Sequence, residues 1–334
     1  MLIFHRNFII LLLFVIFVSI SFTANEPILV IENPVRATSL CFTGDAAKIV
    51  VGGEDGAVRV FDLLSGYILH EYKTANYEIE LLDISRNDEF VAFRKNSKVA
   101  VLNVTSGLIK ETTNALKAKF LSGSAKIALT YGRGGAGLWD IDRGEEYLHI
   151  DINSIVSPMD ISPDDSILAL GFGGGMGKDI RFGSIILWDL LSGERLHVLE
   201  EEITYAVESV DFSPSGRWIL TGHGPSIANA EVNLWDVKTG KRIRKYVLNE
   251  RARIAFNAYV FPDEEKIAAV IMGRQIGIFN LQTGEEIAKY HIGDNFSSFA
   301  LSPIGNLYAV WNNGEIQIWG VNYSSDITDW LKNK

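Results

Sequence analysis

Residues 188–193 read WDLLSG, and variants of this hexad recur along the chain. The copies are FDLLSG at 61, LNVTSG at 102, WDIDRG at 139, WDLLSG at 188, WDVKTG at 235, FNLQTG at 279 and a weaker WGVNYS at 319. They end at residues 66, 107, 144, 193, 240, 284 and 324, so neighbouring copies lie 37 to 49 residues apart. A repeat of this period predicts an array of small structural units, each with room for four short strands.

The residues around each hexad indicate that all four elements of the unit are strands. An apolar run such as IILW at 185–188 leads into the hexad, and a hairpin pattern such as ISPDDSILALGFG at 161–173 lies upstream of that run. Ser, Pro, Asp and Gly supply the hairpin turns between β-forming residues. Another alternating run, such as ERLHVLE at 194–200, follows the hexad. The unit is therefore an outer strand followed by strands a, b and c, repeated seven times.

These repeats resemble the WD-repeat (WD40) β-propeller family over about residues 28–322. The resemblance rests on the S-P-D and S-P-S turns at 162 and 213 and on three signature dipeptides, Trp139-Asp140, Trp188-Asp189 and Trp235-Asp236. No Gly-His pair precedes strand a, and most of the family's internal His, Ser/Thr, Asp and Trp hydrogen-bond set is missing. The resemblance implies an all-β fold, a seven-bladed β-propeller of four-stranded antiparallel blades, with a non-enzymatic, protein-binding role.

The two ends of the repeat array indicate how the ring closes. No outer strand follows the last strand c, whereas PILVIE at 27–32 is an apolar strand with no blade of its own. An open array would leave unpaired backbone groups at both ends. We therefore expect residues 27–32 to pair with the last blade, and deletion of residues 25–33 to lower the melting temperature sharply.

The N-terminus has the pattern of an export signal. A short basic start containing Arg6 precedes an apolar run from Phe8 to Val18 and then small residues. We expect residues 1–24 to be a signal peptide, residues 25–323 the propeller and residues 324–334 a tail. The alternative is an uncleaved membrane anchor. Cleavage of the signal predicts an exported propeller, in the periplasm or the extracellular space, whereas an uncleaved segment would anchor it to the membrane. The single cysteine, Cys41, excludes an internal disulfide.

Charge and glycine patterns argue against nucleic acids and nucleotide cofactors. The formal net charge is −10, which disfavours a phosphate backbone as partner. The run GFGGGMGKDIRFGS at 171–184 lacks P-loop spacing, because Phe172 and Asp179 stand where glycine and a hydroxyl are needed. Residues 132–137 fit G-x-G-x-x-G but precede a strand, not a helix. No cofactor and no metal site is therefore expected.

Long loops on one rim suggest the contact surface. The b–c connections of three neighbouring blades are unusual or extended, and binding residues often lie on such loops. We expect them to gather basic side chains that bind a protein partner, through an acidic segment or a glycan: Arg133, Lys178, Arg181, His223 and, from the next blade, Arg274.

Two other functions remain open. A propeller hydrolase or lactonase would need polar side chains converging on the central channel, and Asp55, Asn153, His223 and Asn312 are available. A membrane-tethered assembly factor would keep its N-terminal segment. We interpret the acidic pairs at 140/142, 164/165 and 264/265 as turn caps, not as calcium or acid–base sites. A monomer is expected.

Overall fold

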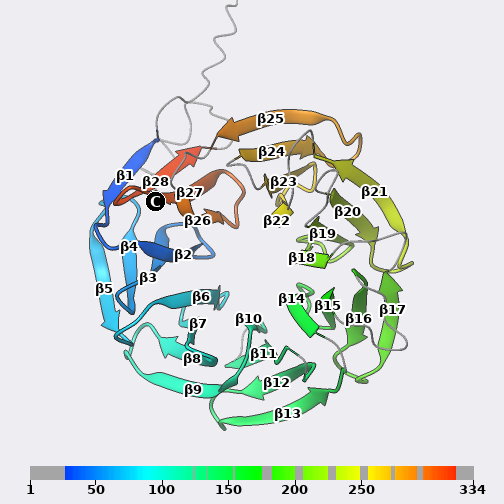
Figure 1. Ribbon diagram of the computed structural model, residues 1–334, viewed down its shortest axis with the longest axis horizontal. Coiled ribbons are helices and arrows are strands. Elements are labelled where there is room, and N and C mark those ends of the chain that lie inside the picture. Colours follow the sequence, from blue (N-terminus) through cyan, green and yellow to red (C-terminus); the bar gives the residue numbers. More distant parts are fainter. Residues whose placement is uncertain are drawn as a thin grey trace, which may run out of the picture.

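The computed structural model describes residues 27–122, 125–132, 134–152, 155–174, 183–199, 206–224, 231–248, 255–271, 275–291 and 296–320. Their 28 strands form seven four-stranded antiparallel sheets. The sheets stand like blades around a central axis (Figure 1). This confirms the predicted seven-bladed β-propeller. The predicted signal segment at residues 1–24 and the tail at 324–334 lie outside the described residues.

In blades one to six, the four strands follow one another in chain order from the central axis to the outer edge. The strands of blades one to three are β2 (Ala37–Phe42), β3 (Lys48–Gly53), β4 (Ala57–Asp62), β5 (Ile68–Lys73), β6 (Ile79–Ile84), β7 (Phe90–Lys95), β8 (Lys98–Asn103), β9 (Ile109–Asn114), β10 (Lys117–Phe120), β11 (Lys126–Thr130), β12 (Ala136–Asp140) and β13 (Glu145–Ile150). Those of blades four and five are β14 (Ile155–Ile161), β15 (Ile167–Gly174), β16 (Ile185–Asp189), β17 (Arg195–Leu199), β18 (Ala206–Phe212), β19 (Trp218–Gly224), β20 (Glu231–Asp236) and β21 (Arg242–Val247).

Blade six contains β22 (Ala255–Val260), β23 (Lys266–Ile271), β24 (Gln275–Asn280) and β25 (Glu286–His291). Blade seven contains β26 (Phe296–Leu301), β27 (Leu307–Asn312) and β28 (Glu315–Gly320), with β1 (Leu29–Glu32) as its outer strand. The a–b and c–d turns lie on one side of the ring, which we call the turn face. The b–c connections and those that lead into strand a lie on the opposite side, the loop face.

The recurring hexad is the c–d turn, and its residue types explain its geometry. In blade four, the Asp189 carboxylate accepts hydrogen bonds from the amides of Leu191 (3.0 Å) and Ser192 (2.6 Å). Gly193 then takes a φ of 72°, where a side chain would be strained, and its amide donates to the carbonyl of Asp189. Asp62, Asn103, Asp140, Asp236 and Asn280 cap the equivalent turns in the same way. The interpretation as a turn cap is thus confirmed for Asp140, whereas the Asp142 carboxylate pairs with Lys110 of blade two at 3.0 Å.

The core consists of separate clusters of buried apolar side chains, each between two neighbouring blades. One such cluster joins blades four and five, where Leu187 and Ile219 are both fully buried with Trp235. Every blade has two apolar faces, and both are shielded from water only when the blade has a neighbour on each side. The ring therefore has to close to complete its core.

Carboxylates on three a–b turns also link neighbouring blades on the turn face. The side chain of Asp88 accepts from the amide of Gly44 (2.8 Å), and Asp165 accepts from that of Ser122 (2.9 Å). Glu264 likewise accepts from the amide of Ser215 (2.7 Å). These bonds join blade two to one, four to three and six to five. The interpretation as a turn cap is confirmed for Asp164, which accepts from the amide of Ser166 at 3.1 Å, whereas Asp165 and Glu264 bond to turns of neighbouring blades.

Closure uses the predicted N-terminal strand. β1 pairs antiparallel with β28, with Leu29 opposite Ile318 and Glu32 opposite Glu315. The amides of Ile28 and Asn33 extend this pairing, donating to the carbonyls of Ile318 (2.8 Å) and Gly314 (2.9 Å). Ile31 is 3% exposed and lies in the cluster shared by blades seven and one.

We predict that Ile31→Ala lowers the free energy of unfolding by about 2–4 kcal/mol, because the lost side chain leaves a cavity at the closing interface. Val30, the preceding residue of the same strand, is 43% exposed. Val30→Ala should change stability by no more than about 0.5 kcal/mol. Urea denaturation of both variants checks this, and equal effects would contradict a closing role for β1.

Candidate functional site

The predicted basic rim is only partly open to test. Arg133, Lys178, Arg181 and Arg274 lie outside the described residues. The described member, His223, is 1% exposed and therefore lies inside blade five, not on the exposed rim where the sequence placed it. The physical reason is that β19 extends through Gly224, so the histidine belongs to a strand rather than to a loop.

The His223 side chain takes part in a buried polar chain. Its Nε2 lies 2.8 Å from the hydroxyl of Thr221, and that hydroxyl accepts a hydrogen bond from the indole nitrogen of Trp235 at 3.0 Å. All three side chains are at most 1% exposed. The threonine hydroxyl thus satisfies two buried ring groups at once, a structural task within the blade.

Thr221→Val should therefore destabilise the protein by about 1–3 kcal/mol, because it leaves polar atoms of Trp235 and His223 buried without this partner. Thr221→Ser keeps the hydroxyl and should retain most of the stability. Thermal denaturation followed by tryptophan fluorescence measures both variants. If valine were tolerated as well as serine, the hydroxyl would not be the connecting group.

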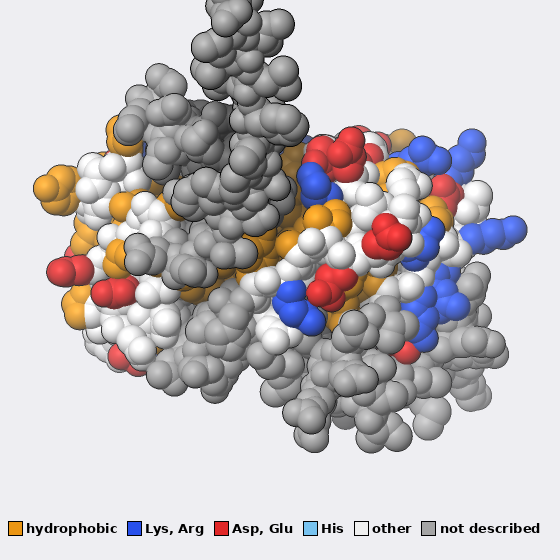
Figure 2. Space-filling view, turned by 90° about the horizontal axis from the view of Figure 1, so that it is seen from above, with side chains coloured by type: hydrophobic (Ala, Val, Ile, Leu, Met, Phe, Trp, Pro, Cys, Tyr) orange, Lys and Arg blue, Asp and Glu red, His pale blue; other side chains and the backbone are white. Residues whose placement is uncertain are grey.

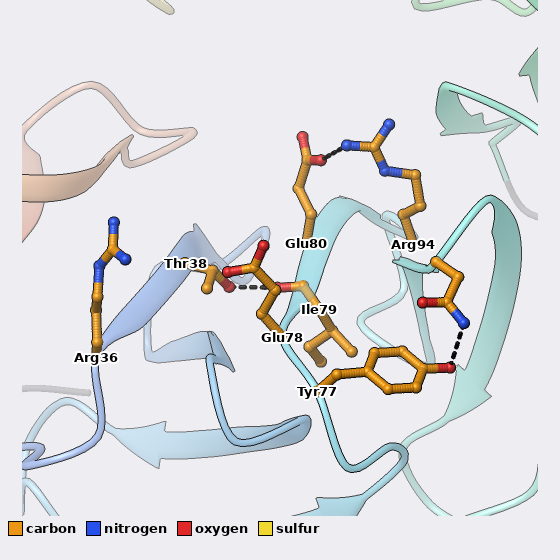
Figure 3. Close-up of a pocket in the computed structure, with 8 residues that line it drawn as sticks. Arg36, Thr38, Tyr77, Glu78, Ile79, Glu80 and Arg94 are labelled. Carbon is orange, nitrogen blue, oxygen red and sulfur yellow. Dashed lines mark hydrogen bonds and ion pairs between the residues drawn. The ribbon is translucent and has the colours of Figure 1, made fainter.

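On the loop face, a cavity of about 520 Å³ opens between blades one and two (Figure 3). Its walls come from the connections that lead into β2 and β6, from β6 itself and from the end of β7 and the turn after it. The lining residues are Arg36, Thr38, Tyr77, Glu78, Ile79, Glu80, Arg94 and Asn96. We call this cavity the blade one–two pocket.

Internal contacts fix one wall of the blade one–two pocket. The Glu80 carboxylate forms ion pairs with Arg94 and, at 3.1 Å, with Lys117 of blade three. The side-chain amide of Asn96 donates to the hydroxyl of Tyr77 at 2.9 Å. Because two cations already hold Glu80, this carboxylate has a positioning role and is poorly suited to act as a general base.

The opposite wall presents an available cation. Arg36 is exposed, and no hydrogen bond or ion pair engages its guanidinium among the residues that the structure describes. Figure 3 shows this side chain standing on the opposite side of the pocket from Glu80 and Arg94. A guanidinium binds a carboxylate through two parallel hydrogen bonds. The pocket can therefore accept an acidic group next to the tyrosine ring.

A second polar cluster lies in the central channel towards the turn face. The residue two places before the a–b turn is Cys41, Asp83, Lys119, Asp160, Asp211, Tyr259 and Ala300 in blades one to seven. The Lys119 ammonium lies 3.3 Å from the Asp160 carboxylate and 3.7 Å from that of Asp83. This channel cluster was not anticipated from the sequence, although aligning the seven repeats at that position would have revealed it.

The aspartates of the channel cluster also connect blades. The Asp83 carboxylate accepts from the amide of Phe120 (2.7 Å), Asp160 from Phe212 (2.7 Å) and Asp211 from Val260 (3.1 Å). Burial, together with the nearby Asp160, raises the pKa of Asp211 to about 8, and Lys119 opposes this shift only partly. Burial also raises the pKa of the Cys41 thiol to about 12, so this cysteine is a poor nucleophile at neutral pH.

The raised pKa of Asp211 predicts a pH dependence of stability. Between the ordinary pKa of 3.8 and about 8, the folded chain holds a proton on Asp211 that the unfolded chain releases. The contribution of Asp211 to the free energy of unfolding therefore decreases as the pH rises through that window, and it stays constant at higher pH. Wild type should lose more stability than Asp211→Asn between pH 5 and pH 9, as measured by urea midpoints.

Asp236→Asn is the matched control for this experiment. Hydrogen bonding by Thr239 lowers the pKa of Asp236, so its stabilisation is present above the ordinary pKa and is lost only in acid. This variant should show the wild-type difference between pH 5 and pH 9. Equal differences for wild type and Asp211→Asn would refute the assignment.

The residues considered for a hydrolase are not assembled into a site by the described structure. The Asp55 carboxylate pairs with Arg59 at 2.6 Å, His223 belongs to the polar chain of blade five, and Asn153 lies outside the described residues. Asn312 ends β27, opposite Glu315 of β28. Within the described ranges, no three His, Cys, Asp or Glu side chains are grouped to hold a metal ion. The same ranges contain no helix with the length and apolarity to cross a membrane.

Comparison with known protein families agrees with the repeat analysis. Residues 25–62 and 193–236 match the family model described as "WD domain, G-beta repeat". These two matches and the seven-bladed ring agree with the resemblance of the hexads to WD40 repeats.

Curated relatives carry the same kind of similarity. Autophagy-related protein 16 of Arabidopsis thaliana is 23% identical over 261 residues, which are 75% of this chain and 48% of that protein. Small ribosomal subunit protein RACK1 of Drosophila melanogaster is 30% identical over 108 residues, 31% of this chain and 29% of the relative. Transcription factor unc-37 of Caenorhabditis elegans is 31% identical over 143 residues, 41% and 23% of the respective lengths. The chain spans about half or less of the length of these relatives.

Proposed function

We propose that this protein is a non-enzymatic propeller that binds an extended, acidic segment of a partner protein in the blade one–two pocket. The observation that carries the proposal is the exposed Arg36 guanidinium, unengaged within the described residues, on the wall of a cavity of about 520 Å³. The other wall is already neutralised, because Glu80 pairs with Arg94 and Lys117. An acidic side chain of the partner would therefore find one free cation and one rigid aromatic surface, Tyr77.

Two further considerations support binding over catalysis. Two pairs in the pocket, Glu80 with Arg94 and Asn96 with Tyr77, are positioning contacts. Arginine and aromatic residues such as Arg36 and Tyr77 are frequent contributors to the binding energy of protein interfaces. One relative, RACK1, is by its printed name a protein of the small ribosomal subunit and so part of a larger assembly. A protein-binding role is the corresponding proposal for this chain.

We also propose that the propeller acts outside the cytoplasm as a monomer. The support is the apolar run from Phe8 to Val18 behind a basic start. The other predicted contact residues stay a prediction: Arg133, Lys178, Arg181 and Arg274.

A photo-crosslinking experiment tests the pocket. A benzophenone amino acid at Tyr77 should form adducts with a partner protein in cells, whereas the same probe at Tyr147 should not. Both tyrosines are exposed, by 38% and 46%, but Tyr147 lies on an outer strand of blade three, away from the pocket.

Arginine variants then show whether the adduct at Tyr77 depends on the pocket. Arg36→Ala should reduce the Tyr77 adduct at least about tenfold, the loss expected for a buried charge-assisted pair. Arg143→Ala, which removes an exposed arginine from a c–d turn on the turn face, should leave the adduct unchanged. Adducts that form equally at both tyrosines, or that survive Arg36→Ala, would count against the proposal.

A further inference from the structure

The outer edge of blade one is unusually apolar. Four large hydrophobic residues of its c–d turn and outer strand are exposed: Leu64 (58%), Tyr67 (76%), Ile68 (48%) and Leu69 (44%). In blade two, Leu108 is 58% exposed at the position equivalent to Tyr67. We call these five residues the apolar edge. Single exposed hydrophobic residues are ordinary in proteins, but a group of neighbours suggests an interaction surface.

The other blades show that the fold does not require this composition. The two residues that follow the hexad glycine are Tyr67 and Ile68 in blade one but charged in blades three to six: Glu145 and Glu146, Glu194 and Arg195, Lys241 and Arg242, Glu285 and Glu286. These residues begin equivalent outer strands on equivalent turns. Tyr67, Ile68 and Leu108 are therefore local features of blades one and two. The position of Leu69 is apolar and exposed in blades three to six as well, and Leu191 of blade four corresponds to Leu64.

Figure 2 shows the distribution of charge along the outer wall. Lys and Arg side chains gather at the end of the molecule where β21 of blade five lies. At the opposite end, where β1 and β5 lie, hydrophobic side chains protrude beside acidic ones, so the basic side chains are concentrated away from the apolar edge.

The apolar edge lies where the chain enters the propeller. β1 runs antiparallel to β28 and so begins on the turn face, the side that carries the c–d turns. The c–d turn of blade one packs on β1, since a Cβ added to Gly66 would lie 3.8 Å from Ile31. The apolar run from Phe8 to Val18 ends ten residues before Ile28 and Leu29. Ten extended residues span at most about 36 Å.

We propose that residues 8–18 are retained as a membrane anchor, the alternative to signal cleavage, and that the apolar edge rests in the interfacial layer of the lipid bilayer to which they hold the chain. An anchor this close to the turn face keeps Leu64 and Tyr67 within reach of the same membrane. Tyrosine favours the boundary between headgroups and acyl chains, and leucine and isoleucine side chains favour its apolar side. The two contacts together give the stable attachment that one weak contact does not.

The net charge of the chain indicates which lipid headgroups the apolar edge can approach. The chain carries 41 acidic and 31 basic residues, so anionic headgroups would repel it as a whole. Binding through the apolar edge therefore needs no anionic lipid and should be seen on zwitterionic phosphatidylcholine vesicles.

Site-specific fluorescence on the full chain, with residues 1–24 verified by mass spectrometry, tests this placement. In a Cys41→Ser background, an NBD label is attached to Ile68→Cys or, as the matched control, to Leu191→Cys. Leu191 occupies the position equivalent to Leu64 on the c–d turn of blade four and is 96% exposed. On phosphatidylcholine vesicles containing spin-labelled lipid, the label at 68 should be quenched at least about threefold more than the label at 191.

A triple variant tests the composition of the edge while retaining a sequence that folds elsewhere in this chain. Leu64→Gln, Tyr67→Glu and Ile68→Glu reproduce the residues of blade six, and a label at Leu69→Cys then reports the contact. Quenching at 69 should be lost relative to the same label without the three changes, and Leu191→Gln should not reduce it. An unchanged melting temperature would show that folding is intact.

Other occupants would give different results. Equal quenching at 68 and 191, or none at 68, would overturn the proposal. Protection of the label at 68 without quenching, together with a dimeric mass in detergent, would assign the edge to a second copy of the chain instead. Because the Tyr77 crosslinks are measured on the other face, a failure of the membrane contact leaves the pocket proposal independently testable.

Discussion

The pairing of β1 with β28 is the contact on which the ring depends. Every other strand pairs with its neighbour in sequence, whereas Leu29 meets Ile318 across almost the whole chain. Loop closure over such a distance costs conformational entropy, and here it is offset by completing the sheet of blade seven and by burying Ile31 between blades seven and one. Without this pairing, the facing apolar sides of blades seven and one would no longer shield each other from water.

Once the ring is closed, the seven blades provide internal comparisons for one another. The shared elements are the capped c–d turns and the apolar faces between blades, and they account for the scaffold. Departures from the shared pattern then require another explanation. Lys119 lies between Asp83 and Asp160 in the channel, and Tyr67 and Ile68 replace charged residues at the edge. On the loop face, Arg36 is exposed and has no side-chain partner among the described residues.

The fold was predictable from the sequence because its determinants are local. Asp189 and Gly193 specify a turn within six residues, and the repeat spacing multiplies that information seven times. His223 shows the limit, since G-H-G reads as a loop, yet the i, i+2 spacing to Thr221 puts both side chains on the face of β19 that Trp235 also occupies from β20. The blade one–two pocket escaped prediction because it combines residues of different blades, whose approach depends on the closed ring. The channel cluster occupies one equivalent position of every repeat and would have been found by aligning the repeats there.

The two proposed surfaces are compatible because of where they lie on a rigid ring. The apolar edge lies at the c–d turns of the turn face, and the blade one–two pocket opens on the loop face, so no partner has to compete with lipid for the same residues. β1 crosses from one face to the other and fixes both relative to the chain entry. A bilayer that holds the edge therefore leaves Arg36 directed away from the lipid, towards segments of partner proteins in the surrounding water.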